Sequence, residues 1–268
     1  MPELPEMETY KTLLTQQIVG KKITEVIVNR NKSINMDSDE FIQKVLNQKV
    51  EAIERRAKYL LFHLENGSCL LLHLMLGGFM FYGKEEERPD RTVQVQLTFG
   101  DKHLYFIGLR LGYLHLYSPE VEGKLKDIGP EPLDVNFSLD TFIEALQQRR
   151  GKLKTTLVDQ EFLAGVGNRY SDEIAWHAHV LPERHVNDLN DQERNRLFQS
   201  IRFILQRAIQ YGGYMEQPLF KDDTLTGGYV DNTYVYNREG EACKRCSTPI
   251  VKDKISSRKT FFCPICQN

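Results

Sequence analysis

Four of the five cysteines stand near the C-terminal end of the 268-residue chain, in two pairs. Cys243 and Cys246 form the first pair and Cys263 and Cys266 form the second, so the spacing reads C-x2-C-x16-C-x2-C. Each pair can point two thiolates at one ion, and two pairs complete a tetrahedron, as in structural zinc sites. The alternative is a chance thiol cluster or a redox pair. The spacing predicts one structural Zn²⁺ held by a small ribbon.

The charge balance gives no general sign of a nucleic-acid binder, because the formal net charge is −2. The charges are nevertheless sorted by region. Residues 243–268 carry six Lys and Arg against one Asp, and a second basic cluster lies at 149–154. The ribbon is expected to present Arg258 and Lys259 on a β-hairpin. A solvated charged face is the plain alternative for these two residues.

The fold class expected from the hydrophobic pattern is α+β. Pro5 and Gly20 bracket an N-terminal helix, and short aromatic and aliphatic runs between about 50 and 117 predict an antiparallel β-sandwich. Beyond GPEPL at 129–133 the period becomes helical, with a long helix at 190–211 and then a long loop at 213–231. The predicted domains are a β-sandwich catalytic domain (1–130), a helical domain (131–238) and a zinc finger (239–268).

No stretch approaches the roughly 18 consecutive apolar residues of a membrane span, and the first ten residues lack the features of a secretory signal. We therefore expect an intracellular, cytoplasmic protein with no membrane partner.

The fifth cysteine, Cys69, lies in an apolar run and is expected to be buried. The single tryptophan, Trp176, is expected in the helical core.

A tight turn, Gly165-Val166-Gly167-Asn168, lies between two short helical patterns. Its glycines allow another backbone to come close, and the free N–H groups at the start of the second helix form an anion site. A DNA phosphate would fit there. Taken alone, this turn is more typical of two helices that are simply joined by glycines.

The N-terminus offers a third candidate site. If Met1 is removed, Pro2 becomes a secondary amine, and an α-amino group with a pKa near 8 is partly unprotonated at neutral pH. Such an amine can attack an electrophilic carbon and form an iminium ion. Glu3 and Glu6 could then serve as general acid or base. In isolation, PELPE is more typical of an acidic helix start.

Several motifs occur in one order along the whole chain: PELPEMET, RRAKYLLFHL, HLMLGG, GPEPL, LVDQEFLAGVGNRYSDE and the four-cysteine ribbon. This order resembles the family of formamidopyrimidine-DNA glycosylases and endonuclease VIII. The opening PELPE is closer to the formamidopyrimidine branch. The resemblance implies a monomeric two-domain protein with a helix–two-turns–helix motif at about 155–178. It also implies double-stranded DNA with a damaged base or an abasic site as partner, and action at the nucleoid.

The resemblance further implies base excision followed by strand cleavage through β,δ-elimination. Pro2 would be the nucleophile, Glu3 the acid acting on the sugar ring oxygen, and Glu6 its support. Lys58 would contact phosphate near the lesion. The other DNA contacts would be Lys154, Asn168, Arg258 and Arg110.

The chain departs from the family pattern in three places. HLMLGG puts Leu76 where the family has methionine, and IGLRLG puts Leu109 and Leu111 where it has arginine and phenylalanine. Leu76 and Leu111 remain candidates for intercalation, since wedges can be aliphatic. The loss of the arginine removes a probe of the opposite base. In the lesion-capping loop, Glu216 and Gln217 stand where an apolar and a basic residue are expected.

Three functions are therefore compared. The first is a bifunctional DNA glycosylase and abasic-site lyase that removes oxidised bases, favoured by the intact PELPE and Lys58. The second is a damaged-DNA or abasic-site binding protein with weak or no glycosylase activity, favoured by the altered loops. The third is a zinc-ribbon protein unrelated to DNA, whose only support is the acidic pI.

Overall fold

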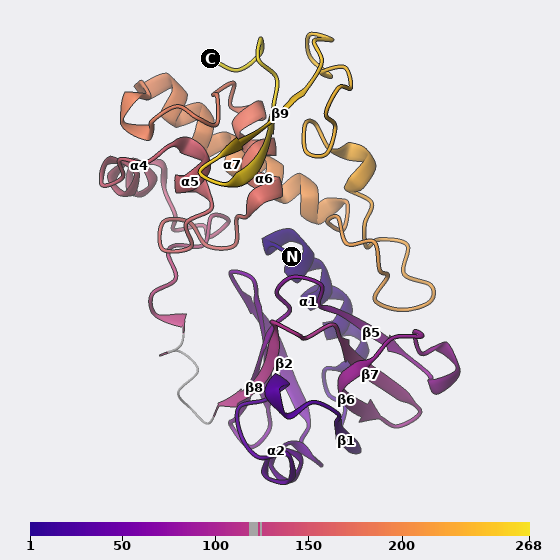
Figure 1. The fold of residues 1–268 in the computed structure, drawn as a ribbon. Coiled ribbons are helices and arrows are strands. Elements are labelled where there is room, and N and C mark those ends of the chain that lie inside the picture. Colours follow the sequence, from indigo (N-terminus) through magenta and orange to yellow (C-terminus); the bar gives the residue numbers. More distant parts are fainter. Residues whose placement is uncertain (118–122, 124) are drawn as a thin grey trace. The chain divides into compact units, whose positions relative to one another are not determined.

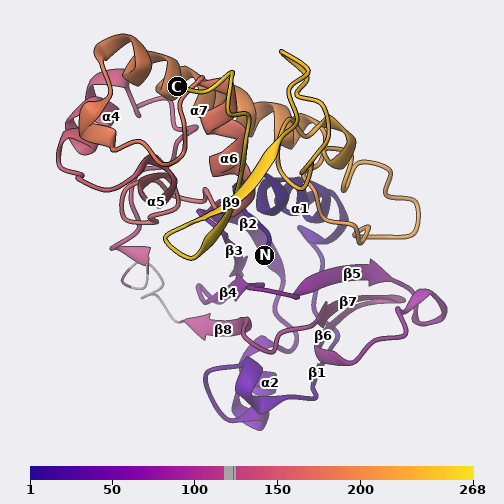
Figure 2. The same ribbon diagram turned by 45° about the horizontal axis from the view of Figure 1, so that its top comes forward.

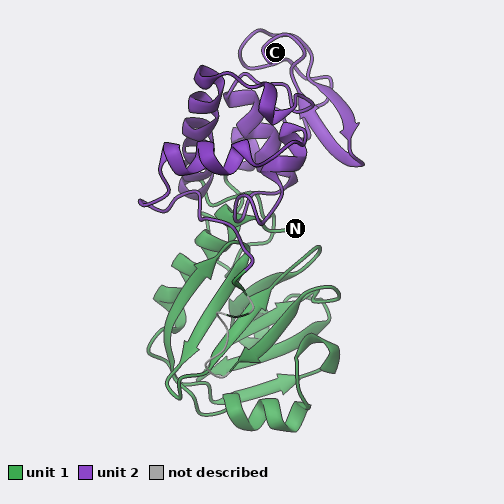
Figure 3. Ribbon diagram, turned by 90° about the vertical axis from the view of Figure 1, so that its left-hand side faces the viewer, with its two compact units in different colours: residues 1–126, 211–228 green, residues 127–210, 229–268 purple. Residues whose placement is uncertain are grey.

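The computed structural model describes residues 1–117, 123 and 125–268. The chain forms two compact units (Figure 3), which are described separately below. Unit 1 comprises residues 1–126 and 211–228, and unit 2 comprises residues 127–210 and 229–268. The loop 211–228 belongs to unit 1, because it packs with the N-terminal residues.

Unit 1 contains two helices and eight strands in the described residues (Figure 1). The helices are α1 (Leu4–Ile18) and α2 (Ser38–Val45). The strands are β1 (Glu25–Val28), β2 (Val50–Arg56), β3 (Tyr59–Leu64), β4 (Cys69–His73), β5 (Phe79–Gly83), β6 (Val93–Phe99), β7 (Lys102–Ile107) and β8 (Tyr113–Tyr117). Short 3-10 turns lie at Asn31–Ser33 and Glu85–Glu87.

The strands form two antiparallel four-stranded sheets, ordered β2-β3-β4-β8 and β1-β6-β7-β5 (Figure 2). Alternate side chains of both sheets, such as Leu60 and Phe62 of β3 and Leu104 and Phe106 of β7, enter one hydrophobic core. The inner face of α1 joins the same core through Met7, Tyr10, Leu14 and Ile18. Cys69 is buried, as its apolar surroundings predicted.

Unit 2 contains the helices α4 (Leu139–Gln147), α5 (Leu153–Leu157), α6 (Asn168–His177) and α7 (Asp191–Gln210). Two 3-10 turns lie at Val186–Asp188 and Val230–Asn232. Helix α7 matches the predicted 190–211 helix, because its apolar residues recur at helical spacing and pack on α6. The last elements are the antiparallel strands β9 (Val251–Ile255) and β10 (Arg258–Phe262), the predicted hairpin.

The structure therefore confirms the α+β class. Among the described residues, no helix is long and apolar enough to cross a membrane.

Candidate functional site

The first candidate site lies at the start of α1, where Pro2, Glu3 and Glu6 are all buried. Glu3 is the N-cap residue, and its backbone N–H donates to Oε2 of Glu6 at 2.8 Å. The N–H of Glu3 has no partner within the helix backbone, and the Glu6 side chain supplies one. Glu3 and Glu6 therefore form a capping box at the start of α1. The same bond holds the backbone directly after Pro2 in one conformation.

Glu6 also binds the loop 211–228, which is far away in the sequence. Its Oε1 accepts a hydrogen bond from the backbone N–H of Tyr214 at 3.0 Å, and the Tyr214 hydroxyl donates to the carbonyl of Met1. The loop is tied to the sandwich again where the N–H of Tyr82 donates to the carbonyl of the buried Leu219. Glu6 is therefore a positioning residue that joins the helix start to this loop.

Gly213 makes the close approach of the loop to Glu6 possible. Its φ is +69°, and a Cβ there would lie 2.4 Å from Oε1 of Glu6. We expect Gly213→Ala to lower the free energy of unfolding by about 1–3 kcal/mol more than Gly100→Ala does, because a clash is added to the backbone strain. Gly100 is the matched control, since its φ is +71° and nothing lies near its Cβ position. Denaturant unfolding of both variants measures the difference, and equal losses would contradict the clash.

Lys58 lies in the turn between β2 and β3, and it is only 6% exposed. The turn requires a positive φ of 52° at Ala57, whose carbonyl accepts a bond from Arg55 at 3.1 Å. Arg55 also donates to Glu8 of α1 at 2.6 Å. A short series of contacts thus connects the first turns of α1 with the turn that carries Lys58.

His73 pairs with Tyr59 across β3 and β4, so it lies at the same end of the sheet as Lys58. Burial, together with the charge of Lys58, lowers the pKa of His73 to about 4. The imidazole is consequently neutral at pH 7.

The two candidate wedge residues are exposed on the turns that follow β4 and β7. Leu76 is 67% exposed and Leu111 is 63% exposed, whereas Leu109 is fully buried in the core. The two turns pack closely, because a Cβ at Gly108 would lie 2.1 Å from the carbonyl oxygen of Gly77. Exposed leucines of this size on adjoining turns are a feature of interaction surfaces rather than of a folded core.

In unit 2 the glycine turn connects α5 to α6 by way of a buried loop. Gln160 fixes it, because its side chain donates to the carbonyl of Val166 at 2.8 Å and accepts from the N–H of Gly165 at 3.0 Å. Gly165 has a φ of +83°, which favours glycine. Asn168 is the first residue of α6, so its half-exposed side chain lies at the N-terminus of this helix.

Lys154, a predicted phosphate ligand, lies inside unit 2 beside the start of α6. Its side chain is fully buried, and its ammonium donates to Asp172 at 2.6 Å, to the carbonyl of Asn168 at 2.8 Å and to Ser171 at 2.9 Å. These bonds brace the start of α6 from within the unit. A contact of Lys154 with DNA stays a prediction.

The four C-terminal cysteines gather into one cluster, with all their Sγ atoms within 4.8 Å of one another. The Sγ atoms of Cys243 and Cys266 are 3.9 Å apart, and those of Cys246 and Cys263 are 3.5 Å apart. Four thiolates at about 2.3 Å from a central ion are separated by about 3.8 Å in a tetrahedron. The donor set and its geometry therefore fit a tetrahedral metal ion.

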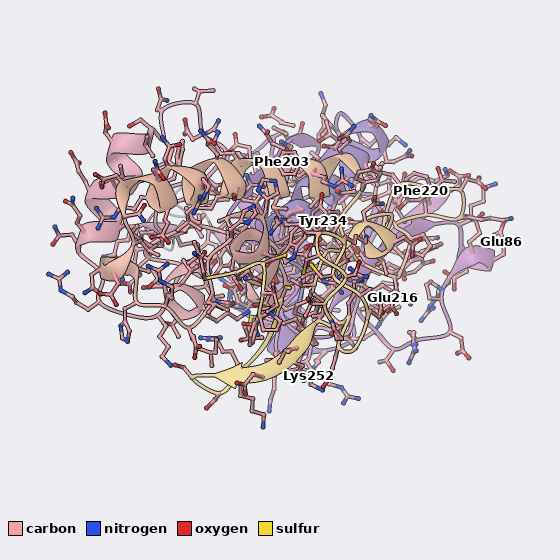
Figure 4. The ribbon with its side chains drawn as sticks, turned by 90° about the horizontal axis from the view of Figure 1, so that it is seen from above. Glu86, Phe203, Glu216, Phe220, Tyr234 and Lys252 are labelled. Atoms are coloured by element: carbon pink, nitrogen blue, oxygen red, sulfur yellow. The ribbon has the colours of Figure 1, made fainter. Side chains whose placement is uncertain are left out.

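The hairpin β9–β10 extends from the cluster with Arg258 at its tip. Ser256 and Ser257 both have positive φ, as a two-residue hairpin turn requires. Most residues of the hairpin from 251 to 259 are exposed, including Arg258 and Lys252, which Figure 4 shows on β9. The hairpin base is fixed by a bond from the N–H of Phe261 to Asp172 at 3.0 Å.

Two buried carboxylates of α6 were not identified from the sequence. Asp172 joins Lys154 to the hairpin, and Glu173 accepts bonds from the backbone N–H groups of Tyr234, Val235 and Tyr236 and from the Tyr229 hydroxyl. Glu173 thereby anchors the segment that leads into the metal cluster. The only signal in the sequence is two acidic residues on the otherwise apolar face of a helix.

Family models match three parts of the chain. They are described as the formamidopyrimidine-DNA glycosylase N-terminal domain (residues 1–113), the formamidopyrimidine-DNA glycosylase H2TH domain (128–217) and the zinc finger found in FPG and IleRS (240–268). The formamidopyrimidine-DNA glycosylase of Listeria innocua is 37% identical, and that of Herpetosiphon aurantiacus is 36% identical. Each alignment covers 100% of both chains.

The fold is similar to that of solved structures of Lactococcus lactis FPG with DNA. One is a complex of an FPG mutant with Fapy-dG containing DNA (TM-score 0.92, 32% identity, 100% of each chain). Another is a complex with abasic site containing DNA (TM-score 0.92, 32% identity, 99% of each chain). With three domain models in order and full-length relatives above 30% identity, the chain belongs to the formamidopyrimidine-DNA glycosylase family and is a DNA glycosylase of that type.

Proposed function

We propose that this glycosylase is bifunctional: it removes an oxidised base from duplex DNA and cleaves the strand at the resulting abasic site, with Pro2 as nucleophile. The observation that supports this proposal most directly is the buried arrangement of Pro2, Glu3 and Glu6 at the start of α1. Glu6 holds both the backbone after Pro2 and the loop 211–228. A chain that only bound DNA would not need a buried proline and two buried carboxylates at the start of one helix.

The reaction begins once Met1 has been removed, since the nitrogen of Pro2 is otherwise an amide with no available lone pair. The amine forms a bond to C1′ as the glycosidic bond breaks, and the proton that the amine nitrogen gives up leaves with the base. Glu3 protonates the ring oxygen, the C1′–O4′ bond opens, and an iminium ion remains between Pro2 and the sugar.

The iminium ion acidifies the C2′ hydrogens, so loss of one of them expels the 3′ phosphate. A second elimination expels the 5′ phosphate, and water then releases the sugar fragment from Pro2. Lys58, Asn168, Arg258 and Arg110 would hold the DNA during these steps, most of them through phosphate oxygens. Glu6 keeps its positioning role throughout.

We further propose that the ion in the cysteine cluster is one Zn²⁺ with a structural role. Four thiolates leave no open coordination position for substrate, so this ion supports the hairpin rather than the reaction.

We place the activity in the cytoplasm, on nucleoid DNA, and propose a monomer as the working form. Both follow from the proposed substrate and from one chain carrying both the amine and the DNA contacts.

Trp176 is expected to stabilise the metal site. Its indole N–H donates to Sγ of Cys243 at 3.4 Å, and the ring stacks on Tyr234. Trp176→Phe keeps an aromatic ring but removes the donor, so we expect zinc release to a chromogenic chelator to become about 10-fold faster. Tyr234→Phe is the matched control, because it alters the stacked ring without touching sulfur. Equal release rates in the two variants would show that the indole N–H does not support the ion.

The second candidate function, a damaged-DNA binder without chemistry, is favoured by the buried Leu109 and by Glu216 and Gln217 in the loop after Gly213. Borohydride trapping on duplex DNA with an abasic site separates the two. A covalent adduct that peptide mapping places at Pro2 supports the glycosylase and lyase. Tight binding of the same duplex without any adduct would favour the binding protein.

A further inference from the structure

A recess of about 470 Å³ opens in unit 2 at the C-terminal end of α6, beside the last cysteine pair. Its lining consists of His179, Arg196, Arg245, Ile265, Cys266 and Asn268. None of the groups that take part in the proposed reaction lies there. Two guanidinium groups meet an isoleucine that is 69% exposed, so a ligand that matches this recess is anionic and carries apolar groups as well.

The wall at the end of the sequence is fixed by hydrogen bonds to the segment that follows α6. The backbone N–H of Asn268 donates to the carbonyl of His179 at 3.1 Å. The carbonyl of Asn268 accepts from the N–H of Leu181 at 3.2 Å and from the side chain of Arg184 at 3.1 Å. The recess is therefore built before any ligand arrives, and a ligand does not have to order this part of the chain.

Arg245 forms a second wall and keeps donors available. Its guanidinium group lies over the ring of Trp176, 3.9 Å from the centroid. It makes two bonds to the carbonyl of Trp176 and one to Nδ1 of His179, each at 3.2 Å. A guanidinium group has five N–H groups. Within the described residues, two of those of Arg245 thus remain for an acceptor that enters the recess.

Arg196 of α7 supplies the other positive charge. It is exposed, and among the residues that the structure describes its side chain has no hydrogen-bond or ion-pair partner. The acidic side chains nearest to it along α7 are already paired, Asp191 with Arg194 and Glu193 with Arg184. No direct ion pair therefore neutralises the charge of Arg196, and a carboxylate from outside the chain is its natural partner.

The same surface continues along α7 as far as Phe203. Arg196 and Phe203 are seven residues apart, so they lie on one face of the helix, two turns or about 10 Å apart. Phe203 is 44% exposed (Figure 4), and its ring is held by stacking on His177 at 4.4 Å between centroids. Burial, together with the charges of Arg245 and His179 nearby, lowers the pKa of His177. His177 therefore connects the recess to the exposed phenylalanine.

This surface lies away from the two elements of unit 2 that are expected to bind DNA. Asn168 begins α6 and His179 follows its end, so the ten-residue helix separates them by about 15 Å. Arg258 lies at the tip of the hairpin, whereas Ile265 lies beyond its base, and the five residues of β10 span about 16 Å. A duplex held by Asn168 and Arg258 leaves this surface uncovered.

We propose that the surface formed by Arg196, Arg245, Ile265 and Phe203, here called the α7 patch, binds an acidic segment of a partner protein while the enzyme is on DNA. Carboxylates of the segment pair with the two guanidinium groups, and apolar side chains next to them cover the isoleucine and the phenylalanine. Charge complementarity favours this occupant over a second copy of the chain, because two such patches would repel each other.

The first measurement uses a fluorescein-labelled peptide with blocked ends, in which three glutamates stand between a leucine and a phenylalanine. Fluorescence anisotropy should show saturable binding to the full-length protein with a Kd of about 100 µM or lower. The binding should weaken as salt is added, because the paired charges are exposed. A peptide with three glutamines in place of the glutamates should bind at least about 10-fold more weakly.

Three variants locate the peptide on the protein. Arg196→Gln, Ile265→Ser and Phe203→Ser should each weaken binding about 5-fold, through the loss of an ion pair or of apolar contact. Arg194→Gln is the matched control for charge, because Arg194 lies on the same helix but forms its ion pair outside the patch. Val135→Ser is the matched control for apolar surface, since Val135 is 89% exposed elsewhere in unit 2. Thermal unfolding and metal content should show that all five variants remain folded.

The same titration on the complex with an uncleavable abasic-site duplex should give the same peptide affinity within about 2-fold. Displacement of the peptide by the duplex, with weaker DNA binding in Arg196→Gln, would assign the patch to DNA and overturn the proposal. The proposal also fails if the acidic peptide does not bind, if its glutamine counterpart binds equally well, or if the three variants bind like the wild type. The variants should cleave abasic-site DNA at the wild-type rate, so these results leave the proposed function standing, and only loss of cleavage by the wild type itself would contradict that function.

Discussion

Pro2→Gly is expected to lower cleavage of an abasic-site duplex at least about 1,000-fold, a loss of about 4 kcal/mol of transition-state stabilisation. Glycine removes the ring that fixes the nitrogen at the start of α1 and replaces the secondary amine with a mobile primary one. DNA binding should persist, because Lys58, Asn168, Arg110 and Arg258 are untouched. Single-turnover cleavage on a gel and affinity for an uncleavable abasic analogue measure the two properties separately.

Two further samples make this result specific to the amine. Pro5→Ala is the matched control: Pro5 is the other proline of the α1 start, it is also buried, and it carries no chemistry. It should keep its cleavage activity. Wild-type protein that retains Met1, verified by intact mass, should bind DNA without cleaving it. Unchanged nicking by Pro2→Gly or by the Met1-retaining protein would remove Pro2 from the mechanism.

Cys263→Ser is expected to empty the metal site and to weaken DNA binding at least about 10-fold, whether or not the DNA is damaged. Cys263 is fully buried, and its sulfur accepts from the N–H of Cys266. Without the ion, the two cysteine turns lose their common ligand, and folding of the ribbon is coupled to metal binding. Arg258 would then lie on a hairpin that has lost one of the supports of its base, while the bond from Phe261 to Asp172 remains.

Metal content by elemental analysis and affinity for damaged and undamaged duplexes check this prediction. Cys69→Ala is the matched control, because Cys69 is also buried but lies in β4, outside the cysteine cluster. It should retain the metal and bind DNA as the wild type does. The ratio of the affinity for damaged DNA to the affinity for undamaged DNA should be the same in Cys263→Ser as in the wild type. The reason is that the hairpin is not expected to contact the damaged base. Full affinity in a metal-free variant would contradict the role of the ribbon.

Elements with local signals were predicted well from the sequence. Helix α1 lies between Pro5 and Gly20 as expected, α7 occupies 191–210 against a prediction of 190–211, and the hairpin forms where the cysteine spacing placed it. Helical period, capping residues and ligand spacing are all properties of a few neighbouring residues. Such signals survive in any tertiary context that buries the apolar face.

Contacts between distant segments were decided only by the tertiary structure. Nothing near residue 154 in the sequence shows that its ammonium is enclosed by Asp172 and Ser171, and nothing near residue 213 shows that the loop returns to Glu6. The turn Leu109–Leu111 is a similar case, because burial of Leu109 depends on Arg30 and Gln94. The sequence shows which polar groups are present, but tertiary packing determines which of them are buried away from water and hydrogen-bonded to each other.

The sequence by itself therefore determined the fold class, the metal-binding ribbon and the family, because each rests on residue type and spacing. Only the tertiary structure decided which basic groups are available to DNA. Lys154 is buried and pairs with Asp172 at the start of α6. Arg91 and Arg110, in contrast, are exposed and line one recess of unit 1. The physical reason is that a buried charge must be paired within the protein, whereas an exposed one remains free for a ligand.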